Sequence, residues 1–364
     1  MDSLTQIALG AAVTVATMGR RTAVWKAALW GGVAGTLPDL DVLIDHGNAV
    51  RNMVLHRAET HSLFWLTLLS VPLSAAVVGI HNEWKYWGRW WLALWLGLVT
   101  HPLLDAMTVY GTQLALPFTD YPYAVGSVFI IDPLYTLPLL LGTGWALARR
   151  EKININGELN GKLKGLLSRQ GTMANAFGLL LSTAYLAWGV AAQQQVSQVA
   201  KASLAAQGIE SPQLLVTPTA FNSLLWRVVA VSGDEYLEGY YSLLDKAPMD
   251  QQASITFAHF PRGNALATEL QQNDNVQRIR VFSKGFYALR QQDHRVLITD
   301  LRMGQEPNYI FSFAVAQRHS AAVALPAPEQ MGTRPDIKCG LPWIWRRMWG
   351  EALPPLSEFC AKPH

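Results

Sequence analysis

The sequence predicts a membrane protein in two parts: an N-terminal half of about five to six apolar helices and a C-terminal extramembrane domain of antiparallel β-strands. Long, nearly charge-free segments fill the first half. Runs rich in Val, Ile, Tyr and Phe, separated by turn residues, fill the second. Five of the 14 Trp lie between residues 84 and 95, as in an interfacial aromatic belt. We expect a membrane-embedded helical domain at 1–192, a linker at 193–213, a β domain at 214–320 and an irregular tail rich in Pro and Trp at 321–364.

The first two apolar segments, 4–18 and 23–37, are short and rich in Gly and Ala. Each is near the lower length limit of about 17 residues for crossing a bilayer. Their small residues would let two helices pack closely in a membrane. A buried helical hairpin of a soluble domain remains the alternative for this pair. The membrane interpretation is stronger for the next four segments, which are long and nearly free of charge: 63–80, 90–104, 128–148 and 173–192.

The basic residues predict an orientation in the membrane. Lys and Arg lie between the first and second, the third and fourth, and the fifth and sixth segments, whereas residues 106–127 contain neither. By the positive-inside rule the basic loops are cytoplasmic. The N-terminus, residues 38–62, the loop at 107–127 and everything after residue 192 then face the periplasm of a bacterial-type inner membrane. Arg51 and Arg57 are exceptions on that face.

Composition excludes some classes of function. The formal charge of +3 is too small to favour nucleic-acid binding, and no basic stripe with interleaved aromatic residues is present. The N-terminus lacks the basic region of a secretory signal, so we expect the first apolar segment to be retained. Cys339 and Cys360 either form one disulfide in an oxidising compartment or remain two thiols in a reducing one.

The second half reads as successive strands after a polar, Ala-rich linker or short helix at 193–207. The runs that favour strands begin near residue 214. They are 224–231, 236–244, 255–260, 276–289, 295–301 and 309–316.

Ionisable side chains gather at the predicted periplasmic ends of the apolar segments. Ionisable groups are costly there and need a partner, a proton or a metal. His101 and Asp105 are four residues apart and would project from one helix face. Imidazole and carboxylate groups are good ligands for zinc, manganese or iron. The predicted metal ligands are Asp39, Asp41, His56, His61, His101 and Asp105.

Other residues in the same stretch suit supporting roles. Glu59 is the expected general acid or base, and Arg57 suits an anionic group such as a phosphate. Thr60 could cap a helix that opens with His61. Asp132 is either a helix N-cap or an outer-shell partner of a ligating His. The alternative for the whole set is ordinary polar contacts, in which the His residues bond carbonyls and the Asp residues are solvated at helix ends.

Several motifs together resemble the YdjM-type inner-membrane metal-dependent hydrolases. The N-terminal motifs are 1–5 (MDSLT), 37–41 (LPDLD), 56–62 (HRAETHS), 100–105 (THPLLD) and 110–113 (YGTQ). Those shared with longer members are 131–135 (IDPLY), 221–227 (FNSLLWR) and 282–287 (FSKGFY). The family is grouped with zinc-dependent phospholipase C and the P1-type nucleases, which implies phosphoester hydrolysis at a multinuclear zinc site. Members often carry His at the position of Gln6, so either one metal position is lost here or that His is not a ligand.

These observations predict a membrane-bound metal-dependent hydrolase that acts on a phosphoester or lipid-linked substrate at the membrane surface. We expect one or more divalent metal ions, with zinc favoured, and membrane lipids as partners. The alternative is a non-catalytic envelope membrane protein with a structural metal site and a partner-binding β domain. A transporter fits less well, because the ionisable residues lie at helix ends and no inverted repeat is evident.

Overall fold

The computed structural model describes residues 1–155, 161–209, 213–246, 254–318, 322–333 and 336–361, with the backbone alone for 150–155 and 161–168. The chain divides into two compact units, which are described separately below. The first contains residues 1–43, 57–125 and 130–188; the second contains 44–56, 126–129 and 189–364. Parts of the predicted segments lie outside the described residues: 210–212 of the linker, 247–253 and 319–320 of the β domain, and 321, 334–335 and 362–364 of the tail. Most of the basic side chains expected before the sixth apolar segment also lie outside them.

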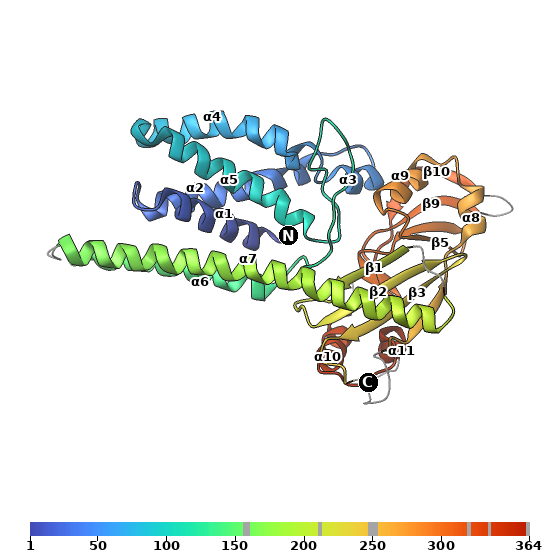
Figure 1. The fold of residues 1–364 in the computed structure, drawn as a ribbon. Helices are drawn as coiled ribbons and strands as arrows, with labels where there is room; N and C mark the ends of the chain where they lie inside the picture. Colours follow the sequence, from blue (N-terminus) through green and yellow to red (C-terminus); the bar gives the residue numbers. More distant parts are fainter. Residues whose placement is uncertain (156–160, 210–212, 247–253, 319–321, 334–335, 362–364) are drawn as a thin grey trace. The chain divides into compact units, whose positions relative to one another are not determined.

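The first unit is helical (Figure 1). Helix α1 packs against α2, α5 and α6, and α4 packs against α5. Three short 3-10 helices connect these elements. The helices are α1 (Ser3–Met18), α2 (Val24–Thr36), η1 (Leu37–Leu43), η2 (Glu59–His61), α4 (Leu63–His81), η3 (Trp84–Tyr86), α5 (Trp87–Ala106), α6 (Pro133–Ile155) and the first part of α7 (Gly161–Ala206).

Helices α1 and α2 approach each other closely because glycines line their contact. A Cβ added to Gly10 would lie 2.2 Å from the carbonyl oxygen of Gly31, and one added to Gly35 would lie 2.4 Å from that of Gln6. No side chain fits at these distances. The small residues of the first two apolar segments thus set the spacing of this helix pair.

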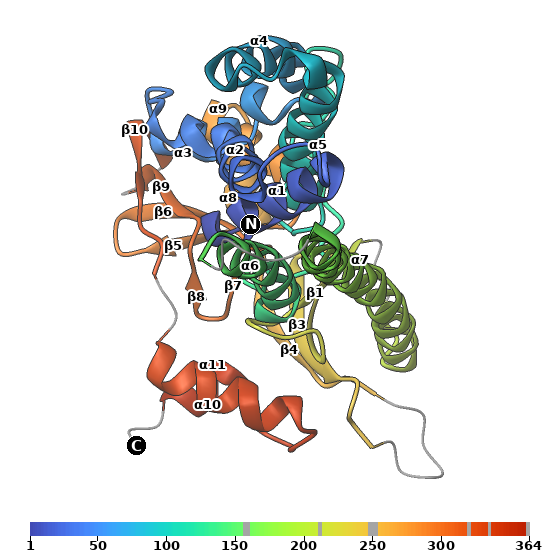
Figure 2. The same ribbon diagram turned by 90° about the vertical axis from the view of Figure 1, so that its left-hand side faces the viewer.

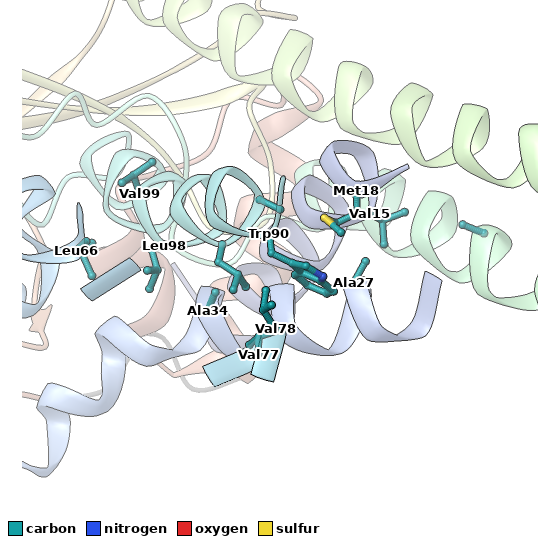
Figure 3. Close-up of a cluster of buried hydrophobic side chains, with 13 residues drawn as sticks. Val15, Met18, Ala27, Ala34, Leu66, Val77, Val78, Trp90, Leu98 and Val99 are labelled. Carbon is teal, nitrogen blue, oxygen red and sulfur yellow. The ribbon is translucent and has the colours of Figure 1, made fainter. Parts of the chain in front are cut away.

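The centre of the bundle is the indole of Trp90, which is fully buried. Figure 3 shows it among Val15, Met18, Ala27 and Val78, which come from α1, α2 and α4. One residue of the predicted aromatic belt is therefore a core residue that joins four helices.

Glu83 ties three helices together where α4 ends. Its carboxylate accepts hydrogen bonds from Trp90 Nε1 at 2.8 Å, Lys26 Nζ at 2.7 Å and Thr22 Oγ1 at 2.9 Å. Burial raises the pKa of Glu83, but the hydrogen bonds from Lys26, Trp90 and Thr22 outweigh it and hold the pKa below its usual 4.5.

Two of the described helices are long and apolar enough to cross a membrane: α4 and the Arg169–Ala206 part of α7. The expectation of five to six such helices is therefore too high. Helices α1 and α2 have only 16 and 13 residues. Helix α5 has the length, but its Trp, Gly, His, Arg and Asp residues lower its hydropathy.

The second unit is built on two four-stranded antiparallel sheets, whose strand orders are β1-β2-β3-β4 and β10-β9-β6-β5. Val229 and Tyr236 of the first sheet pack against Ala288 of the second. The strands are β1 (Gln213–Pro218), β2 (Leu225–Ser232), β3 (Glu235–Ser242), β4 (Phe257–Pro261), β5 (Tyr287–Gln292), β6 (Arg295–Asp300), β7 (Gly304–Gln305), β8 (Asn308–Tyr309), β9 (Ser312–Arg318) and β10 (Ala322–Gln330).

Of the two alternatives for 193–207, a linker or a short helix, the structure has a helix, because α7 continues through this segment to Ala206. Its apolar residues recur every four positions and pack against Trp226 and Val228 of the first sheet. They are Ala192, Val196, Ala200 and Leu204. A polar, Ala-rich segment with this spacing is therefore one face of the core of the second unit.

The expected strand at 276–289 is also wrong in its first part, which forms α9 (Asp274–Phe282). Asn273 caps this helix by accepting from the amides of Asn275 and Val276 at 3.0 and 3.2 Å. Only β5 continues as a strand. Short helices α3 (Ala49–Leu55) and α8 (Asn264–Glu269) complete this side of the unit.

The described part of the C-terminal tail is not irregular. It contains β10, α10 (Ile337–Met348) and α11 (Leu356–Ala361), and Figures 1 and 2 show the two helices side by side. A disulfide joins Cys339 of α10 to Cys360 of α11, with the Cα atoms 5.8 Å apart. Of the two alternatives left open by the sequence, the structure has the disulfide.

Candidate metal centre

Four ionisable side chains converge in the first unit: Asp39 of η1, His61 of η2, and His101 and Asp105 of α5. One donor atom from each lies within 4.8 Å of all the others. The Nε2 atoms of the two histidines are 3.1 Å apart. Asp39 Oδ1 lies 3.5 and 3.3 Å from them, and Asp105 Oδ2 lies 3.4 Å from each.

Local sequence explains how these side chains meet. Helix α2 ends at Thr36, and the chain continues through Leu37 and Pro38 as the 3-10 helix η1, which carries Asp39. His101 and Asp105 are one helical turn apart on α5 and face the same point. Burial is nearly complete for His61, His101 and Asp105, whereas the Asp39 side chain is 20% exposed.

The hydrogen bonds of His101 assign its protonation. Its Nδ1 lies 2.7 Å from the carbonyl oxygen of Gly35. A carbonyl oxygen can only accept, so Nδ1 carries the hydrogen. In the neutral ring, Nε2 then presents a lone pair to the centre of the cluster, the arrangement found for metal-binding histidines.

Thr60 does the same for His61. Its hydroxyl donates to Asp41 Oδ2 at 3.0 Å, so its oxygen accepts from His61 Nδ1 at 2.9 Å. The Nε2 of His61 therefore also presents a lone pair. The predicted capping role of Thr60 is wrong, since α4 begins at Leu63 and Ser62 is its N-cap.

The donor set fits a divalent metal ion. Two imidazole nitrogens and two carboxylate oxygens face one point, and Asp105 Oδ2 receives no hydrogen bond from the described residues. An extra proton would join only two of the four acceptors, whereas a metal ion would join all of them. In a tetrahedral site with metal–ligand distances of about 2.0–2.1 Å, ligand atoms lie about 3.3–3.4 Å apart. The five separations given above range from 3.1 to 3.5 Å and so bracket that value.

Asp105 is held by a shell of donors. Its Oδ1 accepts from Gln6 Nε2 at 3.1 Å and from the amino group of Met1. Its Oδ2 forms an ion pair with Arg57 Nε at 3.2 Å. Gln6 thus donates to one of the four clustered side chains and is not a member of the cluster.

Arg57 is buried and occupies an unusual backbone position. Its φ is 68°, in the left-handed region that costs energy for a residue with a side chain. Its amide donates to Asp41 Oδ2 at 2.9 Å, and its guanidinium lies over Tyr110 and donates to Thr108 Oγ1. The guanidinium therefore balances the charge of Asp105 inside the protein.

The other predicted residues lie outside the four-residue cluster. Asp41 accepts hydrogen bonds from Arg57 and Thr60. Glu59 is exposed at the start of η2. His56 follows α3 and belongs to the second unit. Asp132 caps α6 through the amide of Leu134 and accepts from Tyr185, the capping alternative of the two considered.

Sequence reasoning missed the residues that orient the ligands. The Gly35 carbonyl has no side-chain signal, and only the three-dimensional contact reveals its role. Gln6 and Thr60 carry a weak sequence signal, because each is a polar residue in or near an apolar segment, Gln6 directly after the 1–5 motif and Thr60 within the 56–62 motif. Such residues usually find a polar partner in the interior.

Comparison with known proteins places this cluster in a shared region. The model of a family described as YdjM inner membrane protein matches residues 1–196. The uncharacterized protein YfhP of Bacillus subtilis is 29% identical over 139 residues, covering 36% of this chain and 42% of YfhP. The inner membrane protein YbcI of Escherichia coli is 39% identical over 84 residues, covering 22% of this chain and 46% of YbcI.

These alignments span less than half the length of each curated relative. No solved structure matches the chain. Neither relative's name states an activity, so the implied likeness to phospholipase C and the P1-type nucleases stays a prediction.

Proposed function

The chain belongs to the YdjM inner membrane protein family, and from that premise we propose that it is a membrane-bound metal-dependent hydrolase. The observation that carries the proposal is the convergence of two imidazole nitrogens and two carboxylate oxygens on one point. Asp39, His61, His101 and Asp105 would hold the ion, with zinc favoured by the donor set and separations. Such an ion lowers the pKa of a bound water and polarises a phosphoryl oxygen.

The surrounding residues support this chemistry in distinct ways. Arg57 balances Asp105, and the Gly35 carbonyl and Thr60 fix both imidazoles in the ligating tautomer. The 20% exposure of Asp39 leaves a way for substrate to approach on the η1 side. Glu59, exposed one residue before Thr60, is the proposed carrier of the proton to solvent.

A lipid or lipid-linked phosphoester is the proposed substrate class. Leu40, Val42 and Leu43 lie on η1 with Asp39 and Asp41, and their exposures are 50%, 72% and 81%. Three apolar side chains this exposed suit contact with acyl chains rather than with water. A substrate with its headgroup at Asp39 would place its apolar part along this rim.

The proposed location is a multi-pass inner-membrane protein with the metal centre and the second unit on the periplasmic side. The Cys339–Cys360 disulfide supports that side, because structural disulfides persist in oxidising compartments. A reporter enzyme that is active only in the periplasm, fused after Gly111, is expected to be active. Activity of a cytoplasm-specific reporter there would invert the orientation.

A non-catalytic envelope protein is the second candidate. Four protein donors fill a tetrahedral site, as in structural zinc sites, whereas catalytic sites keep a position for water. In that case the β domain would bind an envelope partner and the metal would only hold η1, η2 and α5 together.

Elemental analysis of the detergent-purified chain tests the metal centre. We expect stoichiometric divalent metal in the wild type, and its loss in His101→Ala. His259→Ala is the matched control, because His259 is half-exposed on β4, outside the metal-binding unit. Equal metal content in both variants would remove the basis of the proposal.

Catalysis is tested separately on the metal-loaded chain. A screen of phospholipid and lipid-linked phosphoesters should give hydrolysis that His101→Ala abolishes and His259→Ala retains. Inorganic phosphate added to the cobalt-substituted protein should change its absorption spectrum if a coordination position is open. An unchanged spectrum together with no hydrolysis would favour the structural candidate.

A further inference from the structure

Helix α10 carries an apolar stripe on its exposed face. The stripe consists of Ile337, Leu341, Trp345 and Trp349, spaced four residues apart, with Trp349 directly after the helix. Their exposures are 68%, 40%, 60% and 58%. Residues at this spacing lie on one side of a helix, so the four side chains form one continuous surface.

The rest of α10 is fixed to the second unit. Trp343 and Met348 are buried against Leu225 and Leu356, and the Trp343 indole donates to the Pro354 carbonyl oxygen at 2.9 Å. The Cys339 disulfide adds a covalent attachment to α11. The helix therefore already has a buried face, and the stripe is a second apolar face that folding does not use.

The chemistry of the stripe suits the boundary between lipid and water. The rings of Trp345 and Trp349 contact each other edge to face at 5.7 Å between centroids. Trp is enriched at this boundary because its ring is apolar and its N–H is polar. Residues 337–348 contain no Asp or Glu, and Lys338 and Arg346 are exposed beside the stripe, Arg346 in an ion pair with Glu351. Basic residues beside an exposed apolar face are typical of helices that lie on anionic membranes.

We propose that this face of α10 docks the second unit on the bilayer surface, with Trp345 and Trp349 in the headgroup region. The unit is continuous with α7, part of which is long and apolar enough to cross a membrane. A membrane crossed by that part of α7 would be tethered to the second unit, and a surface too small to bind vesicles from solution is sufficient when tethered. The inference is independent of any hydrolase activity.

Photocrosslinking of the full-length chain tests the docking. p-Benzoylphenylalanine is placed at Trp345, and at Gln292, an exposed polar residue that ends β5, as the control. Each protein is reconstituted in vesicles of phosphatidylethanolamine and phosphatidylglycerol and irradiated. Mass spectrometry should find lipid adducts several-fold more often on the Trp345 peptide than on the Gln292 peptide. Equal yields, or a covalent dimer in place of lipid adducts, would overturn the proposal.

A second pair of proteins separates docking from misfolding. The probe is placed at Leu341, with and without Trp345→Ser and Trp349→Ser. Only molecules that retain the disulfide by non-reducing electrophoresis are compared, so every measured molecule has α10 attached to α11. We expect the lipid-adduct yield to fall several-fold in the double variant. An unchanged yield would show that the two Trp do not hold the helix at the bilayer. Irradiation in cells that gives one heavier protein band in place of lipid adducts would identify a protein partner and overturn the docking on lipid.

Discussion

At the scale of single residues, Gln6 determines how firmly Asp105 faces the two histidines. Its amide donates to Asp105 Oδ1 and to the His101 carbonyl oxygen, and so links α1 to both acidic and imidazole ligands of α5. A family-like His at this position could donate to the same carboxylate from a ring nitrogen. The side chain at position 6 is therefore needed as a hydrogen-bond donor to Asp105, not as a metal ligand.

Replacing Gln6 tests that reading. Gln6→Leu removes the donor, and we expect metal affinity to fall by about 10- to 100-fold, the usual effect of losing an outer-shell partner. Gln6→His should retain affinity near that of the wild type. Competition with a chromophoric chelator measures both. A Leu variant that binds as tightly as the wild type, or a His variant with an additional stoichiometric ion, would contradict the assignment.

Glu83 gives a pH-dependent prediction far from the metal ligands. Its folded-state pKa lies below 4.5, since Lys26, Trp90 and Thr22 stabilise the carboxylate despite burial. Its stabilising effect is therefore present above about pH 4.5 and lost as the pH falls through the lower, folded-state pKa. Glu83→Gln should lower the thermal unfolding temperature in detergent at pH 7. The difference from the wild type should shrink on acidification, and a difference that grows instead would contradict the prediction.

The residue types of the candidate metal centre could be predicted from the sequence, but the orientation of its side chains could not. Asp39, His61, His101 and Asp105 were expected together because of residue type and helix-end position. Which nitrogen of each ring faces the centre depends on the Gly35 carbonyl and the Thr60 hydroxyl. A backbone carbonyl carries no sequence signal, and a hydroxyl next to a His has several possible partners.

At the scale of elements, the contact between α1 and α2 positions the side chains of the candidate metal centre. Gly35 lies against the Gln6 carbonyl oxygen, and its own carbonyl oxygen accepts from His101. The residue thus fixes both the helix spacing and one ligand. A side chain there would separate the helices and move η1, which carries Asp39.

Gly35→Ala should accordingly disturb stability and metal binding together. The added Cβ would lie 2.4 Å from a backbone oxygen, and overpacking of this kind typically costs about 1–3 kcal/mol. Gly88→Ala is the matched control, since no atom lies within 4 Å of its added Cβ. Thermal unfolding and metal content are measured on both. Equal behaviour of the two variants would show that the α1–α2 contact is not tight.

The ends of an element could be predicted where its sequence is apolar throughout and polar residues flank it. Segment 63–80 is nearly all apolar and became α4 with one residue added. The segment at 276–289 contains the end of a helix and the start of a strand. Its β-branched residues favoured a strand throughout, although Val276, Ile279 and Phe282 are the buried side chains of a helix. Buried residues three positions apart indicate the helix, but apolar residues continue after Phe282, so the sequence does not show where the helix ends.

The C-terminal helices were missed for a related reason. Helix α10 contains Gly340 and Pro342, which both disfavour a helix, and an exposed apolar face that packs against no core of the described residues. Tertiary contacts and the disulfide stabilise it where propensity does not.

At the scale of the whole molecule, the Cys339–Cys360 disulfide bears on two properties: the redox compartment that the second unit faces and the stability of that unit. Its closed segment separates the two cysteines by 21 residues, and constraining a loop of this size stabilises a fold by about 3 kcal/mol. Cys339→Ser should lower the unfolding temperature of the second unit, and Cys360→Ser should do so equally. The wild type, alkylated in cells without reductant, should show no labelled thiol. Complete labelling would exclude both the disulfide and this source of stability.

Which side chains of α7 can pack depends on how far the helix has turned about its own axis at each residue. It runs for 46 residues without interruption, and residues on both of its parts are committed to packing: Gly178 against the Pro138 carbonyl oxygen of α6, and Ala192 to Leu204 against the first sheet. Each residue advances the helix by about 100°. One residue inserted between Val196 and Ala200 would turn Ala200 and Leu204 away from the first sheet while Ala192 and Val196 stay on it. A single-residue insertion in this part of α7 should therefore lower the stability of the second unit, although no residue of the packing face has been replaced.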